Sequence, residues 1–221
     1  MIEHIDEQSL PRAVEELARR DADVARAVAE AGEPPLRRQP RGFPALLRII
    51  VAQQVSVASA QAIWDRLAAA GLAEAPEPVL AHDEDSLRAL GLSRPKARYV
   101  LALARSLIDR TFRPESLDAL DDEAAITAVT ALKGLGRWSA ECYLLFSHGR
   151  PDVFPADDVG LMIGAQKLKG LTARPDAAAL RALVEPWRPY RAVGARLLWH
   201  YRRSAVLPAP TPLAGAAPLP V

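Results

Sequence analysis

The chain has 221 residues, and its 28 basic and 27 acidic side chains give a net charge of +1. A single cysteine excludes an internal disulfide and any cysteine-rich metal or iron–sulfur site, and the four histidines are scattered without ligand spacing, so no metal is expected. No apolar run approaches the roughly 18 residues of a membrane span, and the N-terminus lacks the layout of a signal peptide. We therefore expect a cytoplasmic protein with no membrane partner.

The composition favours helices. Alanine and leucine are abundant and runs of β-branched residues are short, so we expect an all-α protein. Residues 9–30 carry apolar side chains at helical spacing and predict one or two helices, the second capped by Asp21 or Asp23. The following segment, from Gly32 to Pro44, contains four prolines and predicts an irregular connector.

Two glutamines interrupt the next helical pattern. Residues 43–54 are strongly helical up to Gln53 and Gln54, and Ser56 predicts the N-cap of a helix over residues 57–70. The glutamines have a plain interpretation, as a solvated helix end or as amides that satisfy loose carbonyl groups. Two more helices are predicted. The first covers Ser86–Leu90 and is capped by Asp83 or Asp85, and the second begins at Pro95 and runs to about Arg110.

Two glycines one residue apart, Gly134 and Gly136, separate the next two helical patterns. The first covers residues 124–131 after Asp121 or Asp122, the second covers residues 138–146, and together they predict a helix-hairpin-helix. Glycines permit positive φ and remove side chains, so the N–H groups of the turn and of the second helix can meet a phosphate closely. A tight turn between two packed helices is the alternative.

An acidic pair, Asp157 and Asp158, precedes a predicted helix over residues 159–169 that Gly170 ends. One aspartate of such a pair ordinarily caps the helix, and the helix dipole and backbone N–H groups favour its charged form. Two further helices are predicted at residues 177–184 and from Tyr190 or Arg191 to Arg203. The tail over residues 206–221 has no charge and no periodicity, so we expect it to be disordered.

The segments Gly134–Glu141 and Gly149–Asp158 together resemble the signature of the HhH-GPD superfamily of DNA glycosylases, and more narrowly its DNA-3-methyladenine glycosylase II branch. The resemblance extends to Phe43–Ser56, Gly91–Arg98 and Trp187–Arg191. It implies a two-lobed, all-α helix-hairpin-helix glycosylase fold with the active site in the cleft between the lobes. The lobes expected are residues 1–42 with 155–205, and six helices over 43–154 with the hairpin at about 123–147, without the N-terminal β domain that some relatives carry.

The resemblance implies that Asp158 is the catalytic residue. A carboxylate at this position stabilises a sugar that gains oxocarbenium character and orients the attacking water, while Asp157 caps or supports it. Bifunctional members of the superfamily carry a lysine where this chain has Trp138. Because an indole cannot form a Schiff base, the chain resembles a monofunctional enzyme that leaves an abasic site uncut.

The remaining site residues are implied by the same resemblance. Trp138 and Trp199 match positions that stack a flipped purine, although tryptophans on apolar helices are also ordinary core residues. Cys142 stands where some relatives have a tyrosine, which leaves Tyr143 as the neighbouring aromatic residue of the base pocket. Gln54, with Gln53 beside it, occupies the place of the wedge that fills the hole left by an extruded nucleotide. The expected phosphate contacts are Lys133, Gly134, Leu135, Gly136 and Arg137.

These features predict a monomeric DNA glycosylase of base excision repair, associated with the bacterial nucleoid. Its expected substrates are 3-methyladenine and 7-methylguanine in double-stranded DNA, and no cofactor is expected beyond a monovalent cation held by the hairpin carbonyls. Two alternatives stay open. One is a non-catalytic helix-hairpin-helix protein that binds DNA or senses damage, and the other is a glycosylase for a different lesion such as hypoxanthine or ethenoadenine.

Overall fold

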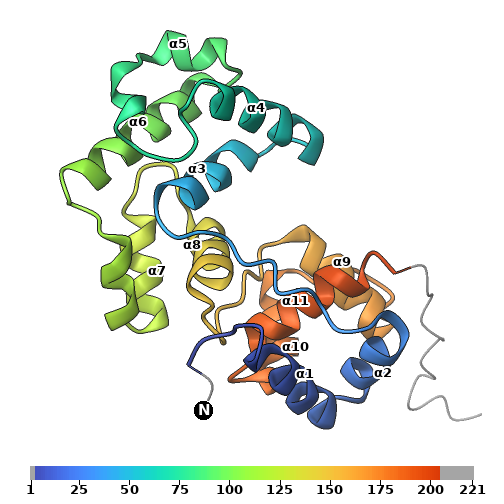
Figure 1. Ribbon diagram of the computed structural model, residues 1–221. Helices are drawn as coiled ribbons and strands as arrows, with labels where there is room; N and C mark the ends of the chain where they lie inside the picture. Colours follow the sequence, from blue (N-terminus) through green and yellow to red (C-terminus); the bar gives the residue numbers. More distant parts are fainter. Residues whose placement is uncertain (1–2, 205–221) are drawn as a thin grey trace, which may run out of the picture. The chain divides into compact units, whose positions relative to one another are not determined.

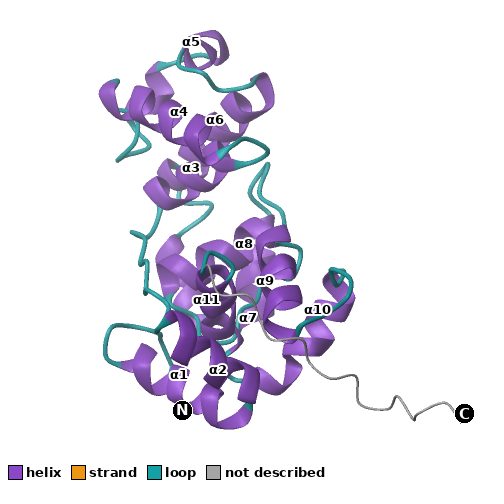
Figure 2. Ribbon diagram, turned by 90° about the vertical axis from the view of Figure 1, so that its right-hand side faces the viewer, coloured by secondary structure: helices purple, strands orange, loops and turns teal. Residues whose placement is uncertain are grey.

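A computed structural model describes residues 3–204 of the chain (Figures 1 and 2). Over that range the regular elements are helices and no strand is present, which confirms the all-α class. No helix within it has both the length and the apolar character needed to cross a membrane. The tail predicted over residues 206–221 lies outside the described residues.

The chain divides into two compact units. The hairpin unit is made by Arg37–Pro155, and the terminal unit by His4–Leu36 together with the described residues from Ala156 onward. The helices of the hairpin unit are α3 (Phe43–Ala52), α4 (Val57–Ala69), α5 (Glu84–Ala89), α6 (Arg94–Ile108), α7 (Asp122–Thr130) and α8 (Arg137–Tyr143). Those of the terminal unit are α1 (Ser9–Arg20), α2 (Ala22–Ala31), α9 (Val159–Lys169), α10 (Ala177–Val184) and α11 (Arg191–Tyr201).

Side-chain caps fix where these helices begin. Five predicted caps are confirmed, because each side chain accepts a hydrogen bond from a backbone N–H group in the first turn of its helix; they are Asp21, Ser56, Asp83, Asp121 and Asp158. The bounds of α9 and α10 agree with the predicted ones. Three short 3-10 helices, Pro78–Ala81, Pro114–Ala119 and Glu185–Trp187, were not predicted.

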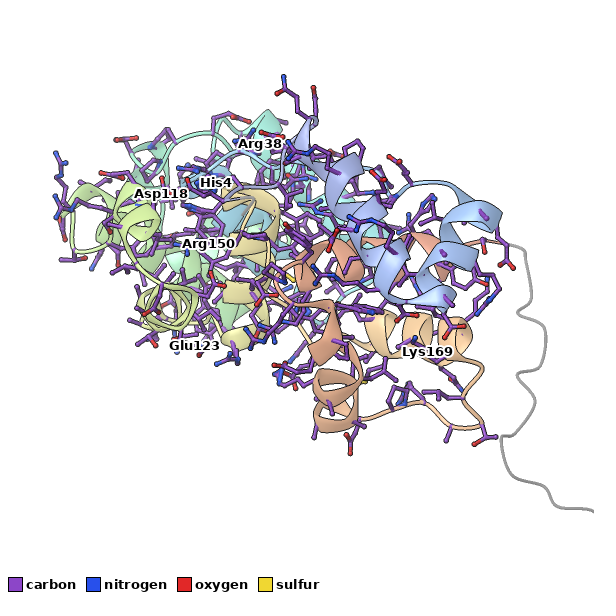
Figure 3. The ribbon with its side chains drawn as sticks, turned by 90° about the horizontal axis from the view of Figure 1, so that it is seen from below. His4, Arg38, Asp118, Glu123, Arg150 and Lys169 are labelled. Carbon is purple, nitrogen blue, oxygen red and sulfur yellow. The ribbon has the colours of Figure 1, made fainter. Side chains whose placement is uncertain are left out.

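The helix after the hairpin differs from its prediction. A regular helix was expected over residues 138–146, but α8 ends at Tyr143 and a π-helical turn, Leu144–His148, continues it to Gly149. Arg150, labelled in Figure 3, follows this turn and donates hydrogen bonds to the carbonyl oxygens of Leu117 (2.5 Å) and Leu120 (2.7 Å). The wider turn keeps the residues after Tyr143 helical, so apolar spacing alone did not reveal the change.

In the hairpin unit α3 packs against α4, α6 and α8, and α7 packs against α8. In the terminal unit α11 packs against α1, α2 and α9. A polar network ties α2 to α9, because Asp21 accepts hydrogen bonds from Lys169 (2.7 Å; labelled in Figure 3) and from Trp187 Nε1 (2.8 Å). Burial raises the pKa of Asp21, but the hydrogen bonds from Lys169, Trp187 and the N–H of Asp23, together with the charge of Lys169, lower it overall.

Candidate active site

The turn between α7 and α8 uses its two glycines differently. Gly134 has φ of 87°, and a Cβ atom there would lie 2.3 Å from ring atoms of Tyr99, so both the backbone and the neighbouring ring require glycine. Gly136 is the N-cap of α8 and has φ of −91°, and a Cβ atom there would meet no other atom within 4 Å. The surface at Gly136 is therefore open where the N–H groups of α8 begin.

The other residues of the turn divide between the core and the surface. Leu135 is buried in the core of the hairpin unit, and its N–H donates to the carbonyl oxygen of Leu132 (3.1 Å). Its predicted contact with phosphate is therefore corrected, because both its side chain and its N–H group are already engaged. Lys133 is exposed, and within residues 3–204 no hydrogen bond or ion pair holds its side chain.

Arg137 forms ion pairs with two glutamates. It donates to both carboxylate oxygens of Glu123 (2.6 and 2.9 Å) and, through Nε, to Glu141 (2.9 Å). The hydrogen bonds that Arg137 donates to Glu123 and the charges of both glutamates raise the pKa of Arg137. These ion pairs join α7 to α8, and the Arg137 side chain remains 45% exposed. Its contact with phosphate, like that of Lys133, stays a prediction.

The loop between α3 and α4 presents an exposed glutamine. After α3 ends at Ala52, Gln54 takes a left-handed conformation with φ of 54°, which is uncommon for a residue other than glycine. The side chain of Gln54 is exposed, and so are two apolar neighbours, Val55 (40% exposed) and Val57 (85% exposed). The loop and the start of α4 thus present a polar side chain beside two apolar ones at the surface.

Gln53 points elsewhere. Its Nε2 donates hydrogen bonds to the carbonyl oxygen of Gly134 (2.9 Å) and to Oγ of Ser139 (3.3 Å). This bears out the plain interpretation of its amide, which satisfies a carbonyl group of the hairpin turn. Gln53 therefore contacts the protein in this structure, and the sequence prediction that places it with Gln54 in the wedge is corrected.

Asp158 lies at the N-terminus of α9 in the terminal unit. Its Oδ1 accepts hydrogen bonds from the backbone N–H of Leu161 (2.9 Å) and from Nε1 of Trp199 on α11 (3.0 Å). The cap and the indole N–H fix the carboxylate from two helices. The neighbouring Asp157 is exposed and pairs with Arg181 (2.9 Å), so of the two aspartates Asp158 is the helix cap.

Two glycines of α9 make this arrangement possible. A Cβ atom on Gly160 would lie 2.9 Å from Oδ1 of Asp158 and 3.4 Å from Nε1 of Trp199. A Cβ atom on Gly164 would lie 2.6 Å from the carbonyl oxygen of Leu198. The absence of both side chains lets α11 approach α9 closely enough for Trp199 to reach Asp158. Neither glycine was predicted as part of the site, although their spacing of four residues places them on one face of a helix.

The aromatic residues predicted for a base pocket have different surroundings. Trp138 and Trp199 are half-buried, and Cys142 is buried. Tyr143 is completely buried in the core of the hairpin unit, and its hydroxyl accepts a hydrogen bond from the N–H of Gly42 (2.9 Å). Burial raises the pKa of Tyr143 to about 12. A ring in this position cannot stack a base, so its assignment to the pocket is corrected to a packing role.

A family model described as HhH-GPD superfamily base excision DNA repair protein matches residues 47–189. The chain belongs to this superfamily, and the resemblance read from its motifs is confirmed. Among relatives, DNA-3-methyladenine glycosylase 1 of Schizosaccharomyces pombe is 31% identical over 161 residues, which cover 71% of each protein.

Solved structures of related glycosylases share the fold. That of the 3-methyladenine DNA glycosylase Mag1 of Schizosaccharomyces pombe in complex with abasic DNA matches with a TM-score of 0.78 and 30% identity, over 85% of this chain and 95% of that one. That of a DNA-3-methyladenine glycosidase from Bacillus halodurans matches with a TM-score of 0.77 and 31% identity, over 87% and 89% of the two chains. The helix-hairpin-helix glycosylase fold is thus confirmed.

Proposed function

We propose that the protein is a monofunctional DNA glycosylase that hydrolyses the N-glycosidic bond of alkylated purines in double-stranded DNA, acting as a monomer in base excision repair. The observation that carries this proposal is the carboxylate of Asp158, fixed at the start of α9 by Leu161 N–H and Trp199 Nε1. It lies within residues 47–189, which the family model matches, in a chain whose relatives are named as 3-methyladenine glycosylases.

The chemistry needs a fixed negative charge more than a strong acid. As the glycosidic bond breaks, the sugar gains positive charge, which the carboxylate of Asp158 stabilises while it orients the attacking water. Methylation at N3 or N7 makes the purine ring cationic, so the base leaves without a strong general acid. The half-buried indole rings of Trp138 and Trp199 suit such a ring, because cations are attracted to aromatic faces.

The nature of residue 138 supports hydrolysis without strand cleavage. Trp138 lies in the first turn of α8, where bifunctional relatives carry the lysine that attacks the sugar. An indole nitrogen is no nucleophile towards a sugar carbon, and Lys133, the nearest lysine in sequence, lies in the hairpin turn. The product is therefore an abasic site in an intact strand.

The hairpin unit would hold the DNA. The open N-terminus of α8 at Gly136 and the side chain of Lys133 suit a phosphate, and the exposed Gln54 suits the space that a flipped nucleotide leaves. Val55 and Val57 beside Gln54 provide the apolar surface that minor-groove wedges use. A monovalent cation at the turn would bind its carbonyl oxygens and neutralise phosphate charge. The carbonyl oxygens of Leu132 and Gly134 each accept a hydrogen bond and keep a second lone pair for it.

Duplexes that each carry one lesion test the proposed function. We expect release of 3-methyladenine and 7-methylguanine, slower or no release of hypoxanthine and ethenoadenine, and strand breaks only after treatment with alkali. Released base and strand length are measured on the same samples. A preference for hypoxanthine or ethenoadenine would support the alternative of a glycosylase for a different lesion. If no base is released from any duplex, the alternative of a non-catalytic DNA-binding protein is favoured.

The hydrogen bond between Trp199 and Asp158 gives a prediction that separates two roles of the indole. Replacing Trp199 with phenylalanine keeps an aromatic ring but removes the N–H donor to a charged acceptor. Because such bonds contribute about 1.5–3 kcal/mol, we expect base release under single-turnover conditions to slow by roughly 10- to 100-fold. DNA affinity, measured by fluorescence anisotropy, should not change. Unchanged base release would show that Trp199 acts only through its ring.

A further inference from the structure

The loop that carries Gln54 has a conformation that must be held in place. Within residues 3–204 only three residues other than glycine have positive φ, namely Arg37, Gln54 and Arg110. A left-handed backbone at such a residue costs free energy, so it persists only where the surrounding contacts fix it. The contacts made by the residues just before Gln54 therefore determine whether the Gln54 side chain keeps a single orientation at the surface.

Lys96 holds the end of the preceding helix. Its side chain is buried, with the residue only 8% exposed, and its Nζ donates a hydrogen bond to the carbonyl oxygen of Val51 (2.9 Å). The last carbonyl groups of a helix lack partners within the helix, so this bond satisfies one of them from α6. Burial lowers the pKa of Lys96, because the ammonium group loses hydration at this position.

Gln53 holds the loop itself to the hairpin. Its amide bridges the carbonyl oxygen of Gly134, inside the turn, and Oγ of Ser139, which is 3% exposed in the first turn of α8. These partners follow Gln53 by 81 and 86 residues in the chain. One amide thus joins the exposed loop to both the turn and the helix that are proposed to bind phosphate.

We propose that Gln53 and Lys96 are positioning residues that hold the loop of Gln54 against the hairpin. The phosphate-binding turn and the wedge residue Gln54 are then kept at a fixed distance from each other when the DNA binds. This inference rests on the proposed function, since it requires Gln54 to be the wedge. Its physical benefit is that the loop need not be ordered when the DNA binds, which lowers the cost of filling the space left by the flipped nucleotide.

Replacing Gln53 with methionine tests the inference, because methionine has a similar length and no N–H donor. We expect excision of a lesion paired in a duplex to slow about tenfold, together with slower base flipping followed by the fluorescence of 2-aminopurine next to the lesion. Excision of the same lesion opposite an abasic site, where no intact base pair has to be broken, should change less than twofold. Gln61 on α4, an exposed glutamine whose Nε2 donates to Asp65 (2.7 Å), provides the matched control, and Gln61→Met should match the wild type on both substrates.

A double substitution shows whether Gln53 acts through Gln54. If it does, Gln53→Met combined with Gln54→Ala excises the paired lesion no more slowly than Gln54→Ala alone.

Lys96→Met should slow excision of the paired lesion in the same selective way. Lys96→Arg, which keeps a donor, should retain most of the wild-type rate. Unfolding in urea identifies any general loss of structure. Equal losses on both substrates, or losses that multiply in the double variant, would overturn the inference. Wild-type protein that releases no base would instead refute the proposed function.

Discussion

Replacing Gly134 with alanine is expected to lower the free energy of unfolding by about 2–4 kcal/mol, the largest stability effect that we predict. Two costs combine at this residue. Its φ of 87° strains any other residue, and the added Cβ atom would lie 2.3 Å from the ring of Tyr99, which packs against the core. Strain of this kind costs about 1–3 kcal/mol, and overpacking adds a similar amount. Urea denaturation followed by circular dichroism measures the loss.

Gly136 provides the matched control two residues away. Alanine there meets no atom within 4 Å and keeps an ordinary φ, so it should cost about 1 kcal/mol or less of stability through the weaker N-cap.

Gly136→Ala should have its larger effect on DNA binding. If a phosphate approaches the open N-terminus of α8, the new methyl group should weaken duplex binding about tenfold at low salt. Equal stability losses at the two glycines would contradict the account of the turn, and unchanged binding by Gly136→Ala would contradict the proposed phosphate site.

The helices could be predicted because their signals are local. Asp158 and Gly170 mark the two ends of α9 within a few residues of its first and last turns, and the same holds for Ser56 at the start of α4. Such caps act through hydrogen bonds to their own helix, so no knowledge of the rest of the chain is needed. The π-helical turn after Tyr143 escaped prediction because it changes the hydrogen-bond pattern without changing the apolar spacing.

The contacts of the site could be predicted only in part. Asp158 was identified from its motif, but its bond to Trp199 joins residues 41 positions apart and depends on the close approach of α9 and α11 at Gly160. Arg137 was expected to meet phosphate because it lies in the hairpin. Its pair with Glu141, four residues later on the same helix, has a local signal, whereas its contact with Glu123, 14 residues earlier on α7, depends on how the two helices pack. Residue type and motif thus indicated which groups matter, while partners set by packing required the structure.

Replacing Asp158 with asparagine should abolish base release while the protein stays folded and binds DNA. Asparagine caps helices about as well as aspartate, so the cost in stability should stay within about 1 kcal/mol, mostly from the lost interaction with the helix dipole. The charge that stabilises the developing positive sugar is gone, and the loss of such a preorganised electrostatic group typically slows a reaction by about a hundredfold to a thousandfold or more. Asp157→Asn is the matched control, because it removes only an exposed ion pair with Arg181.

The most direct measurement compares the wild type, Asp158→Asn and Asp157→Asn on one duplex that carries 7-methylguanine, with single-turnover base release and DNA affinity determined for each. We predict that Asp158→Asn loses at least about a hundredfold in base release and keeps its affinity within about threefold, while Asp157→Asn behaves like the wild type. Base release by Asp158→Asn within about tenfold of the wild-type rate would show that another group performs the hydrolysis.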